Sequence, residues 1–210
     1  MMKQHPPAVF PAADAPGARR RMVAGARRHF FANGFRHVTM DDLAQELGMS
    51  KRTFYTHFPS KNDLLRAVLM DKFDEADADL ARIAAVSTTD VPAALEQLLA
   101  QMQNHANEIQ PPFIRDIRRE APEMFQLVEA RRADIIQRHF GKIFAEGRKT
   151  GMVRKDIPTR LIVEILLGAV QAVVNPAKMA ELGLTPKRGV HCILKVVLDG
   201  VIVGKGKKFL

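Results

Sequence analysis

The sequence predicts an all-α protein, with an N-terminal three-helix unit that contains a helix-turn-helix and a C-terminal helical bundle, about nine helices altogether. Three observations favour this class. Apolar residues recur at helical spacing along most of the chain, capping residues and prolines separate these repeats, and no segment offers a partner for a β-strand. With 210 residues, the chain is long enough to bury a substantial core.

The first helix is predicted over residues 18–33. It follows a proline- and alanine-rich segment, residues 1–16, whose composition is typical of a disordered leader. Four apolar side chains of the helix are expected to point inward: Met22, Ala26, Phe30 and Phe31. Gly34 supplies a stop, because glycine readily adopts the left-handed conformation that ends many helices.

Residues 39–61, TMDDLAQELGMSKRTFYTHFPSK, predict two short helices joined by a tight turn and then the start of another helix. Thr39 and Ser50 are N-cap residues, and Gly48 between them can adopt positive φ and turn the backbone. In the second short helix, Phe54 and Phe58 are one turn apart and can anchor it inward. This pattern is typical of a helix-turn-helix whose second helix enters the DNA major groove.

Positive charge is concentrated around this motif. Residues 17–61 hold nine lysines and arginines against three acids, an excess of +6 within a chain whose formal net charge is +9. Such clustering favours a phosphate backbone as the partner. Seven residues are therefore predicted to contact DNA: Thr39, Lys51, Arg52, Thr53, Tyr55, His57 and Lys61. Of these, Lys51, Arg52 and Thr53 are expected at base edges and the others at phosphates.

The same residues carry a family resemblance. The run T-x-x-x-L-A-x-x-L-G-M-S-x-x-T-F-Y-x-H-F-x-S-K-x-x-L, from Thr39 to Leu64, resembles the DNA-binding signature of the TetR family of bacterial transcriptional regulators. The family often has glycine where this chain has Arg52. An arginine there can bind either a phosphate or a guanine edge, so both alternatives remain open. The resemblance implies a regulator that dimerises through its final two long helices.

The domain organisation follows from these patterns. We expect a DNA-binding domain over residues 17–61, a ligand-binding and dimerisation domain over 62–204, and a basic tail over 205–210. Further helices are predicted over residues 60–85, 90–109, around 113–117, 122–150, 159–174 and 186–203, with a loop between Pro176 and Pro186. The valine-rich last segment has strand propensity, but its apolar residues hold a helical stripe.

The helices predicted over residues 159–174 and 186–203 are apolar on more than one face. A helix of this kind must be buried on several sides, within the chain or against a partner. We predict that these two helices form a homodimer interface, which would supply the two-fold symmetry needed to bind a palindromic operator. An ordinary monomer core is the alternative.

In the family, the helices between residues 91 and 174 surround an effector pocket. Large apolar side chains and polar residues on apolar stripes give the candidates here: Met102, His105, Phe113, Phe125, Arg132, Ile136, His139, Phe140 and Gln171. An inward Arg132 near His139 would suit a ligand with an anionic head and an apolar body. The alternative is an exposed Arg132 with His139 hydrogen-bonded in the core.

Several other classes of protein are disfavoured. No stretch approaches 18 consecutive apolar residues, and no apolar segment follows the N-terminal charges, so we predict a cytoplasmic protein with no membrane span. No glycine-rich phosphate loop, metal-ligand cluster or nucleophile with a base stands out, so no catalysis, metal or cofactor is expected. The one cysteine, Cys192, excludes an internal disulfide.

The function predicted from sequence is a dimeric, ligand-responsive repressor that a small, largely apolar effector releases from its DNA operator. The long helix over residues 60–85 could carry the signal by a pendulum movement. The alternative is an effector-independent or architectural DNA-binding protein whose second domain only dimerises it.

Overall fold

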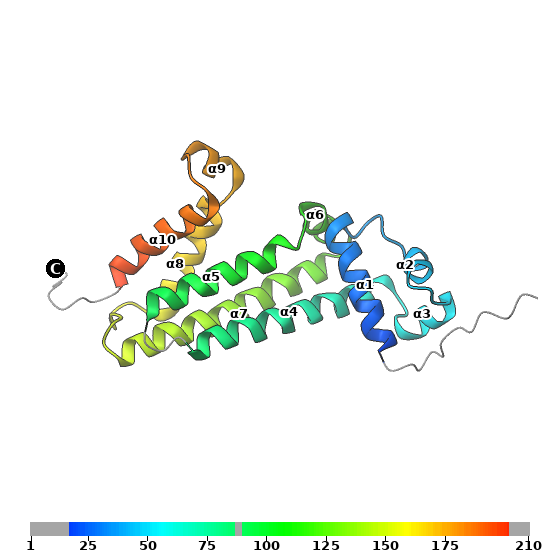
Figure 1. Ribbon diagram of the computed structural model, residues 1–210, viewed down its shortest axis with the longest axis horizontal. Coiled ribbons are helices and arrows are strands. Elements are labelled where there is room, and N and C mark those ends of the chain that lie inside the picture. Colours follow the sequence, from blue (N-terminus) through cyan, green and yellow to red (C-terminus); the bar gives the residue numbers. More distant parts are fainter. Residues whose placement is uncertain (1–16, 87–89, 202–210) are drawn as a thin grey trace, which may run out of the picture. The chain divides into compact units, whose positions relative to one another are not determined.

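The computed structural model describes residues 17–86 and 90–201, so the predicted leader (1–16) and basic tail (205–210) lie outside the described residues (Figure 1). Within the described part the protein is all-helical, as predicted, with ten α-helices and no β-strand. The chain divides into two compact units. Of the described residues, unit 1 comprises 17–74 and 107–129, and unit 2 comprises 75–86, 90–106 and 130–201.

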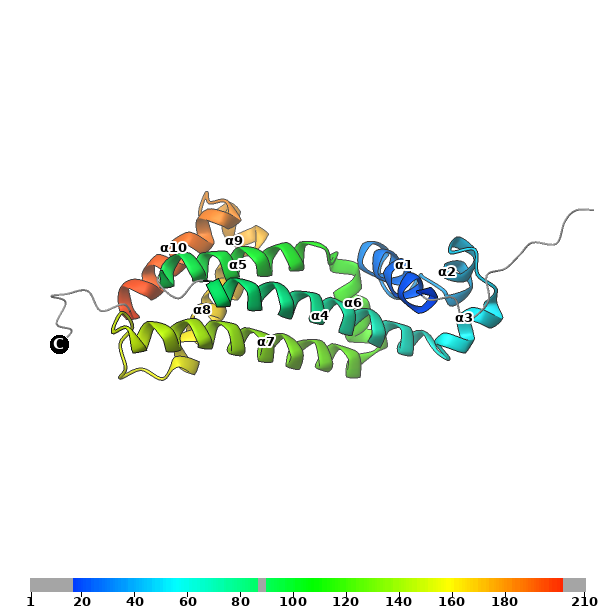
Figure 2. The same cartoon turned by 60° about the horizontal axis from the view of Figure 1, so that its bottom comes forward.

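Unit 1 begins with the predicted helix-turn-helix. Its helices are α1 (Ala18–Asn33), α2 (Met40–Glu46) and α3 (Lys51–His57). Helices α2 and α3 pack against each other, and α1 packs against α2 (Figures 1 and 2). Helix α1 has the predicted bounds, and α2 and α3 begin directly after the predicted N-caps Thr39 and Ser50, because these caps and the glycines that follow α1 and α2 act locally.

A continuous apolar core holds unit 1 together. Its fully buried side chains include Met22, Phe30, Phe54, Leu64 and Leu65. Helix α6 (Pro111–Glu120), although distant in sequence, packs on α1 and adds Phe113, whose ring centroid lies 5.0 Å from that of Phe31. Edge-to-face ring contacts of this kind stabilise a core beyond simple burial. Unit 1 therefore extends past residues 17–61 and includes α6.

A buried carboxylate fixes the segment between α1 and α2. Asp116 of α6 accepts a hydrogen bond from the backbone N–H of Arg36 at 3.0 Å, and this bond lowers the pKa of Asp116. Gly34 ends α1 with φ of 88°, and a Cβ atom there would lie 2.6 Å from Asp116 Oδ2. Glycine is therefore required at position 34 both for its conformation and for the close approach of the carboxylate.

Two long helices belong to both units. Helix α4 (Lys61–Val86) runs from unit 1 into unit 2, and so does α7 (Pro122–Lys149). Unit 2 also contains α5 (Val91–Asn107), α8 (Thr159–Val173) and α10 (Pro186–Val201), and α8 packs against α10 (Figure 1). Its buried residues include Leu80, Leu95, Phe140, Phe144 and Leu166.

Residues 17–86 and 90–201 contain one helix more than the sequence pattern indicated. The segment expected to be a loop between Pro176 and Pro186 contains the short helix α9 (Pro176–Glu181). Its N-cap is Asn175, whose side chain accepts a hydrogen bond from the backbone N–H of Lys178 at 3.0 Å. Asparagine followed by proline is a helix-start signal, but six residues are too few to show a periodic apolar stripe.

None of the helices in residues 17–86 and 90–201 is both long enough and apolar enough to cross a membrane.

Asp116→Asn should lower the free energy of unfolding by about 1 kcal/mol at pH 7, the usual difference between a charged and a neutral hydrogen-bond acceptor. Because the pKa of Asp116 is lowered in the folded protein, its stabilisation is complete above the unfolded pKa of about 3.9 and disappears as the pH falls through the folded value.

Urea unfolding at pH 7 and at progressively lower pH measures this difference, with the exposed Glu129→Gln as the control. The gap between wild type and Asp116→Asn should close in acid. A gap that stays constant down to the lowest pH would contradict the role given to the Asp116 charge.

Candidate nucleic-acid interface

Helix α3 is fixed at its N-terminus by Ser50. The Ser50 hydroxyl oxygen accepts a hydrogen bond from the backbone N–H of Thr53 at 3.0 Å and lies 2.8 Å from the Thr53 hydroxyl. The side chains of Phe54 and Phe58, 0% and 2% exposed, anchor its inner face. Gly48, with φ of 64°, makes the turn before it. These contacts determine which side chains of α3 face outward.

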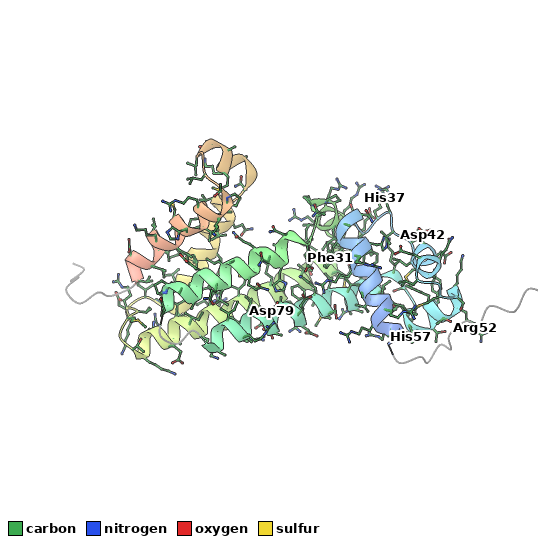
Figure 3. The ribbon with its side chains drawn as sticks, viewed as in Figure 1. Phe31, His37, Asp42, Arg52, His57 and Asp79 are labelled. Atoms are coloured by element: carbon green, nitrogen blue, oxygen red, sulfur yellow. The ribbon has the colours of Figure 1, made fainter. Side chains whose placement is uncertain are left out.

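The outer face of α3 is cationic and polar. Lys51, Arg52, Tyr55 and Thr56 are exposed, and Tyr55 is 45% exposed although its ring is large and apolar. Thr53 and His57 are half-buried. Figure 3 labels Arg52 and His57 near the two ends of this helix. Exposed arginine, lysine and tyrosine side chains on one short helix are suited to contacts with base edges and phosphates.

Lys51 forms an ion pair with Asp41 of α2, with the Lys51 ammonium nitrogen 2.5 Å from the carboxylate. This bond raises the pKa of Lys51, so the side chain remains a cation. Exposed pairs contribute little to stability, because water and salt screen them. Lys51 can therefore leave Asp41 and bind a DNA phosphate with little loss of folding stability.

Thr39 and Lys61 lie outside α3, and the side chains of both bond to groups of the protein itself. The Thr39 hydroxyl caps α2, accepting from the backbone N–H of Asp42 at 3.1 Å and donating to its carboxylate at 2.6 Å. Lys61 donates to the backbone carbonyls of Phe35 and Arg36, and its ammonium lies 4.1 Å from the Phe35 ring centroid. Burial lowers the pKa of Lys61. Both side chains hold the segment between α1 and α2, whether or not they also contact DNA.

The segment between α1 and α2 adds exposed groups that the sequence pattern did not single out. Arg36 and His37 are exposed there, and Figure 3 labels His37 beside α1. In the sequence, Arg36 is distinguished only by its positive charge. Arg27, by contrast, is half-buried and forms an ion pair with Glu108 at 2.7 Å, whereas Arg19 is exposed and lies over the Phe58 ring at 5.1 Å. Net charge along the sequence therefore overstates the charge that faces outward.

The residues predicted for an effector pocket come from both units. Phe113 and Phe125 belong to unit 1, and the other seven belong to unit 2: Met102, His105, Arg132, Ile136, His139, Phe140 and Gln171. Arg132 and Gln171 are exposed. In the described part of the chain, two hollows of about 980 Å³ and 300 Å³ are lined by other residues.

His139 has its own partner. Its Nε2 atom lies 2.6 Å from the Asp77 carboxylate, and this hydrogen bond is the main reason why the pKa of Asp77 is lowered. The side chain of His139 is 7% exposed. The geometry is that of the second sequence-based alternative, with Arg132 exposed and His139 bonded in the core.

Helix α8 presents an apolar stripe to solvent. Leu161 and Ile165 are 48% and 51% exposed, and Gly168 and Ala172 follow at helical spacing on the same side. On the neighbouring α10, Val196 is 75% exposed. Large exposed apolar residues that share one helix face are typical of a protein–protein contact.

Comparison with known proteins agrees with this geometry. Residues 22–68 match the family described as bacterial regulatory proteins, tetR family. The HTH-type transcriptional regulator TtgR of Pseudomonas putida is 29% identical over 92 residues, 43% of this chain and 43% of TtgR. The match thus spans less than half of the length of that relative.

Two solved structures share the fold over most of the chain. A transcriptional regulator from Cytophaga hutchinsonii is 16% identical with a TM-score of 0.71, and the alignment covers 89% of this chain and 100% of that one. SmeT, described as the repressor of the Stenotrophomonas maltophilia multidrug efflux pump SmeDEF, is 17% identical with a TM-score of 0.64 and coverages of 91% and 92%. SmeT has also been solved as a complex with triclosan, and that structure likewise gives a TM-score of 0.64.

Residues 22–68 are thus similar to the DNA-binding domain of the tetR family of bacterial regulatory proteins, and the chain shares the all-helical fold of these solved regulators.

Proposed function

We propose that the protein is a homodimeric transcriptional repressor that binds a palindromic DNA operator and is released from it by a small, largely apolar effector. The observation that carries this proposal is the outer face of α3, where Lys51, Arg52 and Tyr55 are exposed on a helix held by caps and two buried phenylalanines. A rigid helix that presents such side chains can enter the major groove without rearranging.

The exposed stripe on α8 supports the homodimer. One short recognition helix contacts only a few base pairs, so selectivity requires a second copy. A two-fold interface uses the same surface from both chains, and the apolar side chains of Leu161 and Ile165 would meet their own copies across it. Gly168 and Ala172, further along the helix, would allow the two backbones to approach closely.

The effector is supported by the likeness to SmeT, whose complex contains triclosan, and by the continuity of α4. This helix begins at Lys61, next to the segment that holds the helix-turn-helix, and ends in unit 2. An effector that binds unit 2 better in one arrangement of α4 than in another would shift the population of DNA-competent dimers. A coupling of about 1–3 kcal/mol is enough for useful induction.

Arg52→Ala should weaken binding to an operator selected from random DNA by about 1–3 kcal/mol, which is about five- to 150-fold. Fluorescence anisotropy across a range of salt concentrations separates the two roles of Arg52. If Arg52 reads a guanine, the loss will be confined to the selected sequence; if it binds a phosphate, the loss will affect all sequences and the salt slope will fall by about 1.

Arg160→Ala is the matched control, because it removes the same charge from an exposed position on α8. Equal operator affinities for the two variants would show that α3 does not dock in the proposed way.

Ile165→Glu should convert the dimer to a monomer at micromolar concentration, since it would place two carboxylates against each other in an apolar interface. Sedimentation equilibrium measures the dimer dissociation constant. Leu182→Glu is the control: Leu182 is 49% exposed, close to the 51% of Ile165, but it follows α9 and lies outside the stripe. The interface assignment fails if Ile165→Glu remains as dimeric as the control.

A small aromatic compound such as triclosan should raise the melting temperature of the protein and weaken operator binding by about five- to 150-fold. Thermal shift and anisotropy on the same sample measure the two effects. Compounds that stabilise the protein yet leave operator affinity unchanged would favour the effector-independent alternative.

A further inference from the structure

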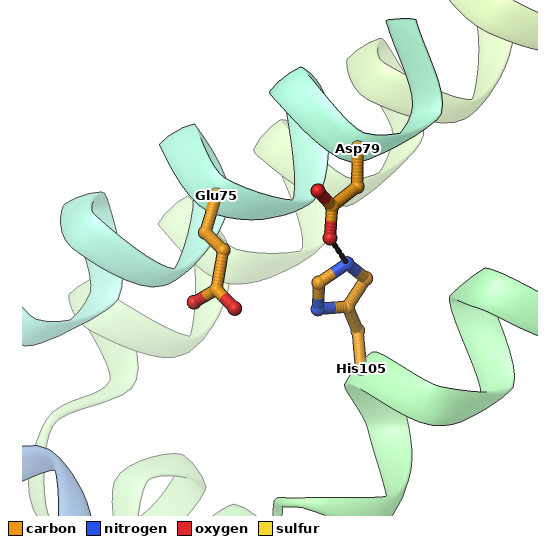
Figure 4. Close-up of side chains that lie close together, drawn as sticks. All are labelled: Glu75, Asp79 and His105. Carbon is orange, nitrogen blue, oxygen red and sulfur yellow. Dashed lines mark ion pairs between the residues drawn. The ribbon is translucent and has the colours of Figure 1, made fainter. Parts of the chain in front are cut away.

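Unit 2 brings together three side chains that could bind a metal ion. Glu75 and Asp79 lie four residues apart on α4 and therefore share one face of that helix, and His105 reaches them from α5 (Figure 4). Each offers one ligand atom, and these atoms all lie within 4.8 Å of one another. Residue spacing along the chain does not reveal this cluster, because the histidine comes from another helix.

The histidine and Asp79 are the inner part of the cluster. His105 Nε2 lies 3.1 Å from Asp79 Oδ2, and the two side chains are only 11% and 18% exposed. A proton on the imidazole nitrogen would make this contact a hydrogen bond. A metal ion can take the place of such a proton, since protons and metals bind the same lone pairs.

The surroundings leave this inner oxygen accessible to an ion. Arg82 bonds the other Asp79 oxygen, Oδ1, from an exposed position, so it does not occupy the side that faces His105. The side chain of Gln101 lies beside both His105 and Asp79, with its amide nitrogen 2.9 Å from Asp79 Oδ2 and 3.3 Å from His105 Nε2. Rotating this amide by half a turn would present its oxygen, which is a possible fourth donor.

The types of ligand atom in this cluster favour one class of metal ion over others. One imidazole nitrogen and two carboxylate oxygens suit Zn²⁺, which binds such atoms at about 2.0–2.2 Å in a tetrahedral arrangement. Donors at the corners of a tetrahedron of that size are about 3.4 Å apart, close to the 3.1 Å between His105 and Asp79. Mg²⁺ and Ca²⁺ prefer shells made of oxygen alone. Exposed Glu75 leaves one side open to water and to the entering ion.

We propose that Glu75, Asp79 and His105 form a binding site for a divalent transition-metal ion of the Zn²⁺ type, with water completing its coordination. The site links α4 to α5 within unit 2. It does not depend on the proposed function, because metal binding is measured without DNA.

Calorimetric titration of the metal-free full-length protein with Zn²⁺ tests the proposal, together with a Co²⁺ titration followed by visible absorption. One Zn²⁺ per chain is expected, and neither Mg²⁺ nor Ca²⁺ should compete at equal concentration. His105→Ala and Glu75→Gln should each weaken Zn²⁺ binding by more than about 100-fold, beyond the loss that removal of an outer-shell partner causes. Glu75 is exposed, so its variant should fold even if His105→Ala does not.

His191→Ala is the matched control. His191 pairs with Glu96 at 2.8 Å in the same unit, from helices α10 and α5, and belongs to no such group of three among the described residues. Its Zn²⁺ affinity should equal that of wild type. The proposal is overturned if wild type shows no Zn²⁺ binding tighter than about millimolar, if Mg²⁺ competes equally, or if Glu75→Gln binds Zn²⁺ as wild type does.

Discussion

The DNA-facing surface depends on the attachment of α3 to the core of unit 1. A helix of seven residues is far too short to be stable by itself in water. It persists because Ser50 satisfies its first backbone N–H groups and because Phe54 and Phe58 are buried among residues from α1 and α4. Every outward side chain takes its direction from these few contacts, so the recognition surface is only as rigid as the core beneath it.

Charged groups inside unit 1 also hold the helix-turn-helix in position on the core. Burial alone would raise the pKa of Glu108, yet hydrogen bonds from Arg27 and Lys72 together lower it. Asp116 holds the backbone of Arg36, and Lys61 holds the carbonyl of Phe35. These bonds tie α1 and the segment after it to α4 and α6. Some cations that look in the sequence like DNA ligands therefore also hold the helix-turn-helix in position.

Local signals in the sequence predicted the helices well, and non-local packing accounts for what they did not show. The caps Thr39 and Ser50, and the stops Gly34 and Gly48, act within a few residues, so their helices could be placed. The membership of α6 in unit 1 depends on Phe113 meeting Phe31, 82 positions away. Likewise, the partners of Lys61 and Arg27 come from other parts of the chain. No periodic pattern records such pairs.

Two of the polar residues predicted on apolar stripes, His105 and His139, illustrate the same limit. Both were predicted as pocket candidates because a buried imidazole needs a partner. Each meets an aspartate of α4, Asp79 and Asp77 respectively. The sequence indicated that partners must exist but could not identify them.

The charged groups around the His139–Asp77 pair differ from those around the His105–Asp79 pair. Asp77 gives both oxygens to Arg138, at 3.0 and 2.8 Å, so a cation already neutralises the His139 pair. Asp79 also has an arginine, Arg82, but on one oxygen, and a second carboxylate, Glu75, lies one helical turn away and within 4.8 Å of the same imidazole. Carboxylates on two sides of a nitrogen donor favour a bound cation. Among the described residues, the His105 pair thus belongs to a group of three possible ligands, whereas arginine takes both oxygens of Asp77 in the His139 pair.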